Sequence, residues 1–141
     1  MNEEVIFQIC NLLVVPGWIL LVAAPRWKWT VRLTMFVIPA ALACIYTFLF
    51  VATFEGLRAT VPSLDMLSYL LRTKSALLST WVHFLALDLF AGAWMVRDSQ
   101  QSKIAHAAVI PCLVLTFLLG PIGLLVYIAA RATIRRATRT P

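Results

Sequence analysis

Long apolar stretches with almost no charges constrain this chain more than any other feature. Four such stretches cover residues 5–24, 31–54, 77–96 and 104–130, and their only Asp, Glu, Lys or Arg residues are Arg32 and Asp88. Each is long enough to cross a bilayer, because a helix needs roughly 20 apolar residues to span a hydrocarbon core of about 30 Å. Hydrophobic residues make up 62% of the chain and charged residues 13%, which disfavours a soluble fold. The sequence therefore predicts an all-α membrane protein with four transmembrane helices, forming one domain over residues 1–141.

The segment between the second and third stretches is mixed in character. Ser63 precedes a short apolar-periodic run, residues 64–71, and Asp65 lies in its first turn. This pattern is typical of a capped amphipathic helix. The run is too short to cross the bilayer, so we expect an interfacial helix on the membrane surface. Residues 97–103 are predicted to form the next loop.

The fourth stretch is longer than a span requires and contains the motif Gly120-Pro121-Ile122-Gly123. Pro121 cannot donate a backbone hydrogen bond, and its ring crowds the carbonyl about one turn earlier. We therefore expect an irregular helix at this point. The length of the stretch alone does not decide whether the helix tilts, kinks or breaks.

The basic residues indicate membrane contact rather than nucleic-acid binding. The net charge is +6, but the cations lie between or beyond the apolar stretches and form no continuous face. Their expected role is to anchor the helices at the head groups, and the basic tail that starts at Arg131 could meet anionic membrane lipids. Four spans would put both termini on one side. Seven cations would then lie on the side of the termini and five on the opposite side, so the charges leave the orientation open. The acidic start, with Glu3 and Glu4, resembles neither a signal peptide nor a transit peptide. We expect a bacterial inner-membrane protein.

Asp88 is the most informative single residue, because it lies near the middle of the third apolar stretch. An ionised aspartate at the bilayer centre costs about 2.5 to 3.5 kcal/mol, so we expect the protonated form and a functional role. His83 lies in the same stretch. The two side chains are about 140° apart around a helix, so they could border one cavity or face different neighbours. Structural hydrogen bonding between helices is the alternative for both residues.

Other polar and aromatic residues complete the candidate site. Asn11 on the first helix could partner either residue. The aromatic side chains that could line an apolar pocket are Trp81, Phe84, Phe90 and Trp94, although packing or lipid contact would explain them equally. Asp98 and His106 offer further metal-ligand types, but their spacing matches no metal motif. We expect them to be solvated loop residues and predict no metal site.

The third stretch and the glycine-proline motif together resemble a known family. The matching segments are Trp81-Val82-His83, Asp88-Leu89-Phe90-Ala91, Asp98, Gly120-Pro121-Ile122-Gly123, and the early Pro16-Gly17-Trp18 and Pro25. They resemble the abscisic acid deficient-four-like membrane proteins, and the likeness covers most of the chain. Plant members of that family are implicated in making neoxanthin from violaxanthin. The resemblance implies a lipophilic, carotenoid-like small molecule as the partner.

The implied reaction is an isomerisation that requires no cofactor. An epoxide opens, a proton leaves the neighbouring carbon, and an allene forms. One group must protonate the oxygen and another must take the proton, and Asp88 and His83 suit these roles in an order the sequence leaves open. A non-catalytic pigment-binding or accessory subunit is the main alternative. A small transporter is a third possibility, which would require an oligomer because the chain has few intramembrane charges.

Overall fold

The computed structural model describes residues 2–54 and 63–137, and every regular element in these ranges is helical. The elements are α1 (Glu3–Ala23), α2 (Thr30–Arg32), the π-helix η1 (Leu33–Val37), α3 (Ile38–Phe54), α4 (Leu64–Leu70), α5 (Lys74–Gln101), α6 (His106–Leu119) and α7 (Pro121–Ala137). The predicted all-α class is confirmed.

Three helical segments are long and apolar enough to cross a membrane: Glu3–Ala23, Thr30–Thr53 and Lys74–Gln101. They correspond to the first three predicted spans and make the chain an integral membrane protein. The predicted loop at residues 97–103 is wrong in most of its length, because α5 continues to Gln101. No glycine or proline interrupts that segment. The helix ends where the Ser102 N–H bonds the Asp98 carbonyl at 2.8 Å.

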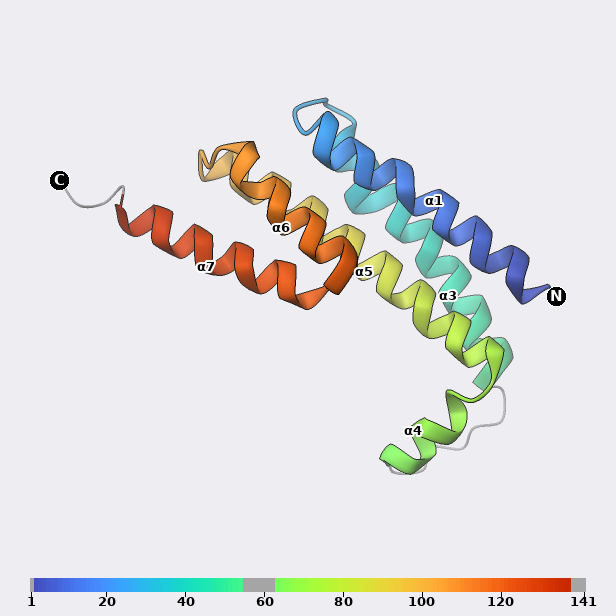
Figure 1. Cartoon of the computed structure of the whole chain (residues 1–141). Helices are drawn as coiled ribbons and strands as arrows, with labels where there is room; N and C mark the ends of the chain where they lie inside the picture. Colours follow the sequence, from blue (N-terminus) through green and yellow to red (C-terminus); the bar gives the residue numbers. More distant parts are fainter. Residues whose placement is uncertain (1, 55–62, 138–141) are drawn as a thin grey trace.

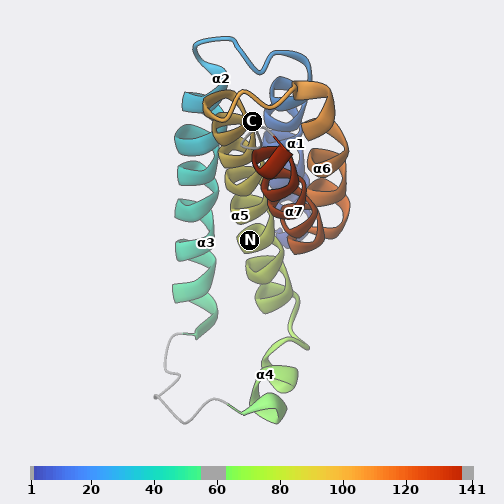
Figure 2. The same ribbon diagram turned by 90° about the vertical axis from the view of Figure 1, so that its left-hand side faces the viewer.

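Helix α5 lies at the centre of the bundle (Figures 1 and 2). Figure 2 shows α3 on one side of α5 and the α6–α7 pair on the other, with α1 behind. The core is built from the apolar faces of these helices, and Val82, Leu89 and Met95 of α5 are completely buried in it. These apolar side chains lie on more than one face of α5, and they are all buried only because other helices surround α5.

The fourth predicted span is two helices and not one. α6 has 14 residues, α7 has 17, and the chain reverses between them at Gly120. α6 runs back along α5 from the end of that helix to its middle, where Gly120 meets Asp88. α7 then returns beside the second half of α5, where Tyr127 bonds Asp98. α6 and α7 therefore form a hairpin that enters the bundle halfway and turns back (Figure 1).

The hairpin changes where the chain ends. Ser75 donates a hydrogen bond to the Glu3 carboxylate, so α1 begins at the same end of the bundle as α5. Arg131 of α7 pairs with Asp98, so α7 runs toward the end where α5 finishes. The first and last described helices thus lead to opposite ends of the bundle (Figure 1). The prediction of both termini on one side, which followed from an even number of spans, is wrong for this arrangement.

The short helix α4 agrees with its sequence pattern. The Ser63 hydroxyl accepts a hydrogen bond from the Met66 N–H at 3.2 Å, which caps the helix start. Figures 1 and 2 show α4 beyond the end of the bundle, and its Leu64, Leu67 and Tyr69 side chains are exposed. Its placement on the membrane surface stays a prediction.

Candidate functional site

The hairpin turn has a backbone that few residues other than glycine adopt. Gly120 has φ +54° and ψ −109°, and its N–H bonds the Thr116 carbonyl at 2.8 Å. Pro121 is the first residue of α7, where a missing N–H removes no helical bond. Gly123 lets the two helices touch, because a Cβ there would lie 2.2 Å from the Thr116 nitrogen. Both glycines of the motif are therefore required for the turn itself.

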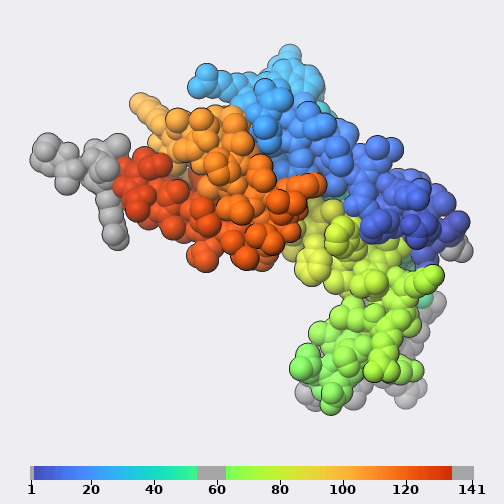
Figure 3. All heavy atoms as spheres, viewed as in Figure 1, coloured from blue at the N-terminus to red at the C-terminus, as the bar shows by residue number. Residues whose placement is uncertain are grey.

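A groove lies between this turn, α5 and α1. Its volume is about 930 Å³. The lining residues are Asn11, Val14, Val15, Trp18, Trp81, His83, Phe84, Leu85, Leu87, Asp88, Ala91, Thr116, Phe117, Leu118, Leu119, Gly120, Pro121 and Leu124. In Figure 3 the surfaces of the blue α1, the yellow-green part of α5 and the orange hairpin meet on one face. The walls are mainly aliphatic and aromatic, as expected of a site for an apolar small molecule.

Asp88 is the acidic member of this groove. Its side chain is half-buried beside Gly120, and it has neither a hydrogen-bond partner nor an ion-pair partner within residues 2–54 and 63–137. Hydrocarbon around the site cannot replace such a partner. A carboxyl group used to tie helices together would be bonded to a neighbouring helix. The carboxyl of Asp88 instead faces the groove.

His83 lines the same groove, farther toward the start of α5. Its ring is exposed and lies 5.4 Å, centroid to centroid, from Tyr46 of α3 and 6.0 Å from Phe84. His83 and Asp88 are separated by about 7.5 Å along the helix axis at 1.5 Å per residue. His83 and Asp88 therefore border the same groove and do not face separate cavities, which the sequence had left open. Their side chains lie at different parts of the groove wall.

Three of the other predicted residues line the groove and two do not. Trp81, Phe84 and Asn11 are in its wall, and the Trp81 Nε1–H donates to Asn11 Oδ1 at 3.3 Å. Phe90 and Trp94 lie outside it. Trp94 instead packs edge-on against Tyr127, with ring centroids 5.8 Å apart. The roles proposed for all these residues stay predictions.

Asp98 is not a solvated loop residue, which corrects the sequence-based expectation. It lies within α5 and is 12% exposed. Tyr127 Oη–H donates to its Oδ2 at 2.7 Å, Arg131 Nη2 donates to its Oδ1 at 2.7 Å, and Arg131 Nε is 2.5 Å from Oδ2. Arg131 is therefore engaged within the protein and not in the basic tail that we expected to meet lipid. This cluster ties α7 to α5 and so holds the hairpin in place.

His106 is also engaged within the protein, since its Nε2 lies 3.1 Å from the Val22 carbonyl oxygen. It is the first residue of α6, and this contact joins α6 to the end of α1. Across the described ranges, no three His, Cys, Asp or Glu side chains gather as metal ligands would.

Sequence reasoning missed the contribution of the hairpin and of α3. Thr116, Phe117 and Gly120 form one wall of the groove, and Tyr46 lies beside His83. The Gly120-Pro121 motif was the available signal for a turn. Its proximity to Asp88 has no local signature, because the two positions are far apart in the chain.

Comparison with known proteins identifies the family of this chain. No curated protein and no solved structure matches the chain. The model of the family described as ABA DEFICIENT 4-like matches residues 5–127, a range that contains both Asp88 and the hairpin turn, and the chain belongs to that family.

Proposed function

We propose that this protein converts a carotenoid-like isoprenoid by acid-base isomerisation in the groove between α1, α5 and the hairpin. The single observation that carries the proposal is the carboxyl group of Asp88. It is half-buried, without a partner in the described part of the chain, and directed at an apolar groove of about 930 Å³. Membership of the ABA DEFICIENT 4-like family supports the choice of an epoxy-carotenoid as substrate.

The chemistry requires one proton to be given and one to be taken. The protonated Asp88 donates to the epoxide oxygen, the carbon–oxygen bond breaks, and its electron pair goes to the oxygen, which becomes a hydroxyl group. Neutral His83 takes a proton from the neighbouring carbon, and that carbon–hydrogen electron pair forms the second double bond of the allene. Substrate and product have the same composition, so transfer of the proton from His83 back to Asp88 restores the site.

The groove supplies the conditions for this step. Apolar walls exclude water, which would otherwise attack the opening epoxide. They also favour the protonated form of Asp88, which is the form that can donate. Trp18, Trp81 and Phe117 offer flat surfaces to a rigid polyene.

The test is conversion by the purified protein. Protein in lipid nanodiscs is incubated with violaxanthin, and products are separated by chromatography and weighed by mass spectrometry. We expect a product of unchanged mass that elutes apart from violaxanthin and shows the infrared stretch of an allene. The matched control is the double variant Asp88→Asn, His83→Gln. Absence of any isomer with the wild-type protein would contradict the proposal.

A pigment-binding accessory subunit is the second candidate. The observation that favours it is His83, whose ring is exposed and lies beside the aromatic rings of Tyr46 and Phe84. Retention of the polyene without conversion, unchanged in the Asp88→Asn, His83→Gln variant, would select this alternative.

A further inference from the structure

Three cavities follow α1 from one end to the other and adjoin at shared residues. The central one is the groove that contains Asp88. A second cavity of about 640 Å³ lies where α1 and α5 begin, and it shares Trp81 with the groove. A third, of about 370 Å³, lies between α1 and α6 and shares Val15, Trp18 and Phe117 with the groove. The cavities therefore form one track along the protein.

The track is as long as a bilayer is thick. Asn2 lines its first cavity and Ala23 its last, and they are about 32 Å apart along α1 at 1.5 Å per residue. The hydrocarbon core of a bilayer measures about 30 Å. An occupant that fills the track must be long and narrow, with its axis parallel to the helices.

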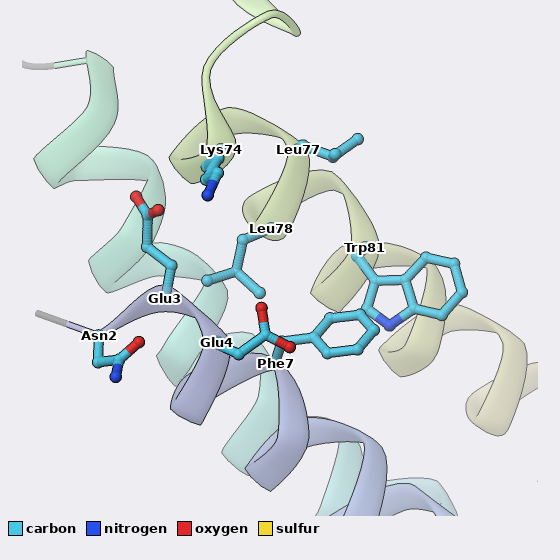
Figure 4. A pocket seen from close by; sticks show the side chains of 8 residues that line it. All are labelled: Asn2, Glu3, Glu4, Phe7, Lys74, Leu77, Leu78 and Trp81. Carbon is cyan, nitrogen blue, oxygen red and sulfur yellow. The ribbon is translucent and has the colours of Figure 1, made fainter.

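The two ends of the track differ in polarity. The cavity between α1 and α6 is lined by Val, Trp, Ile, Ala, Leu and Phe side chains. The cavity where α1 and α5 begin, which we call the end chamber, has Glu3, Glu4 and Lys74 in its wall (Figure 4). Glu3 accepts a hydrogen bond from Ser75. Glu4 and Lys74 have no hydrogen-bond or ion-pair partner in the described ranges, so both can serve a ligand.

Aromatic rings mark the passage from the end chamber to the groove. Phe7 and Trp81 lie with ring centroids 5.8 Å apart, and Figure 4 shows the Phe7 ring beside the Trp81 indole. The Trp81 indole is held on its other side by Asn11 at 3.3 Å. A polyene that leaves the groove would therefore pass along ring faces before it reaches the charged side chains.

We propose that the end chamber is a subsite for the polar terminal group of a long polyene, with Glu4 accepting from a terminal hydroxyl group and Lys74 donating to it. This inference rests on the proposed function, since it takes Asp88 as the group that meets the reacting end. Lys74 and Asp88 are about 21 Å apart along α5 at 1.5 Å per residue. The recognised hydroxyl group is thus on the end of the substrate remote from the reacting epoxide, and the separation selects for chain length.

The experiment compares two polyenes of equal length that cannot react. β-Carotene and its dihydroxylated form, zeaxanthin, both lack an epoxide and differ in their terminal hydroxyl groups. Purified protein on an affinity resin is equilibrated with an equimolar mixture in detergent, and the retained pigments are quantified by chromatography. A hydrogen bond to a charged group should strengthen the binding of the hydroxylated pigment by about tenfold or more. We expect the wild-type protein to enrich zeaxanthin by about that factor.

The variant Glu4→Leu, Lys74→Leu should retain the same total pigment without enrichment. The matched control is Asp65→Leu, Arg72→Leu, which removes one acid and one base from exposed positions in and just after α4; it should enrich zeaxanthin as the wild type does. Enrichment that survives in the Glu4→Leu, Lys74→Leu variant would overturn the subsite. Wild-type retention of both pigments without preference, or of neither, would also overturn the subsite, whereas the proposed function is judged separately by the conversion of violaxanthin.

Discussion

Gly120 lies directly against the carboxyl group of Asp88: a Cβ atom placed on Gly120 would be 3.2 Å from Asp88 Oδ1. The turn of the hairpin thus contacts the middle of α5 with backbone and no side chain. This contact leaves the carboxyl group room to face the groove and brings the Thr116 and Phe117 side chains to the opposite wall. The same motif that breaks the fourth apolar stretch therefore also shapes the candidate site.

Substitutions of Asp88 distinguish a role as a catalytic acid from a purely structural role. Asp88→Asn keeps the size and hydrogen bonding of the side chain but supplies no acidic proton, so we expect normal folding and at least a 100-fold loss of conversion, the usual contribution of a general acid. Asp88→Leu should also lose conversion while the protein stays folded, because the carboxyl holds no partner in the described structure. Conversion is measured in nanodiscs and folding by thermal unfolding in detergent. Full activity in the Asn variant would exclude the acid role.

Replacement of Gly120 by alanine should destabilise the hairpin. The new methyl group would lie 3.2 Å from Asp88 Oδ1. A residue with a Cβ also raises the energy of a backbone in the left-handed region by about 1–2 kcal/mol. We expect a drop of at least that size in the free energy of unfolding, and reduced conversion. Leu119→Ala is the control, because the Leu119 side chain is exposed and its loss should change stability by about 0.5 kcal/mol or less. Equal stability of Gly120→Ala and the wild type would show that the turn is not built as described.

The pair Asp98 and Arg131 should be coupled energetically. Arg131 is 29% exposed, so the full cost of breaking a buried pair, about 3–5 kcal/mol, is an upper limit. A double-mutant cycle with Asp98→Asn and Arg131→Gln should give a coupling of about 1–3 kcal/mol in unfolding. The exposed residues Asp65 and Arg72, treated in the same way, should give a coupling near zero. A coupling near zero for Asp98 and Arg131 would mean that the hairpin is held by packing alone.

The hairpin allows a prediction of the membrane orientation, which the sequence left open. Because α7 returns to the end where α5 finishes, most described cations gather at that end: Arg26, Lys28, Arg32, Arg97, Lys103 and Arg131. Arg72 and Lys74 are at the other. From the positive-inside rule we therefore predict that the start of α1 lies outside and the end of α7 inside.

Tags at the two chain ends test this orientation. An impermeant protease added to intact cells should remove an N-terminal tag and spare a C-terminal one. If both tags were removed or both protected, α6 and α7 would have to cross the membrane as a single helix.

Several features could be predicted from the sequence because they depend on neighbouring residues. Hydropathy and length specify the first three spans, since every backbone group in lipid must be bonded within its own helix. Ser63 specifies the start of α4 through one local hydrogen bond. The chemistry of Asp88 as an uncommon intramembrane carboxyl group was also evident, as were three of the residues in the groove wall.

Tertiary contacts decided the rest. Whether Gly120-Pro121 kinks or reverses the helix depends on what the two halves pack against, and the contacts that settle it, Tyr127 and Arg131 with Asp98, join residues about thirty positions apart. For the same reason Asp98 was mistaken for a solvated residue, and the sequence did not show that Phe90 and Trp94 lie outside the groove. The amino-acid sequence by itself determined which segments are helical and apolar, because helix formation and transfer to lipid are local. Only the packing of those helices determined that the fourth stretch folds back on Asp88, because the energy of that contact comes from side chains that meet only in the folded bundle.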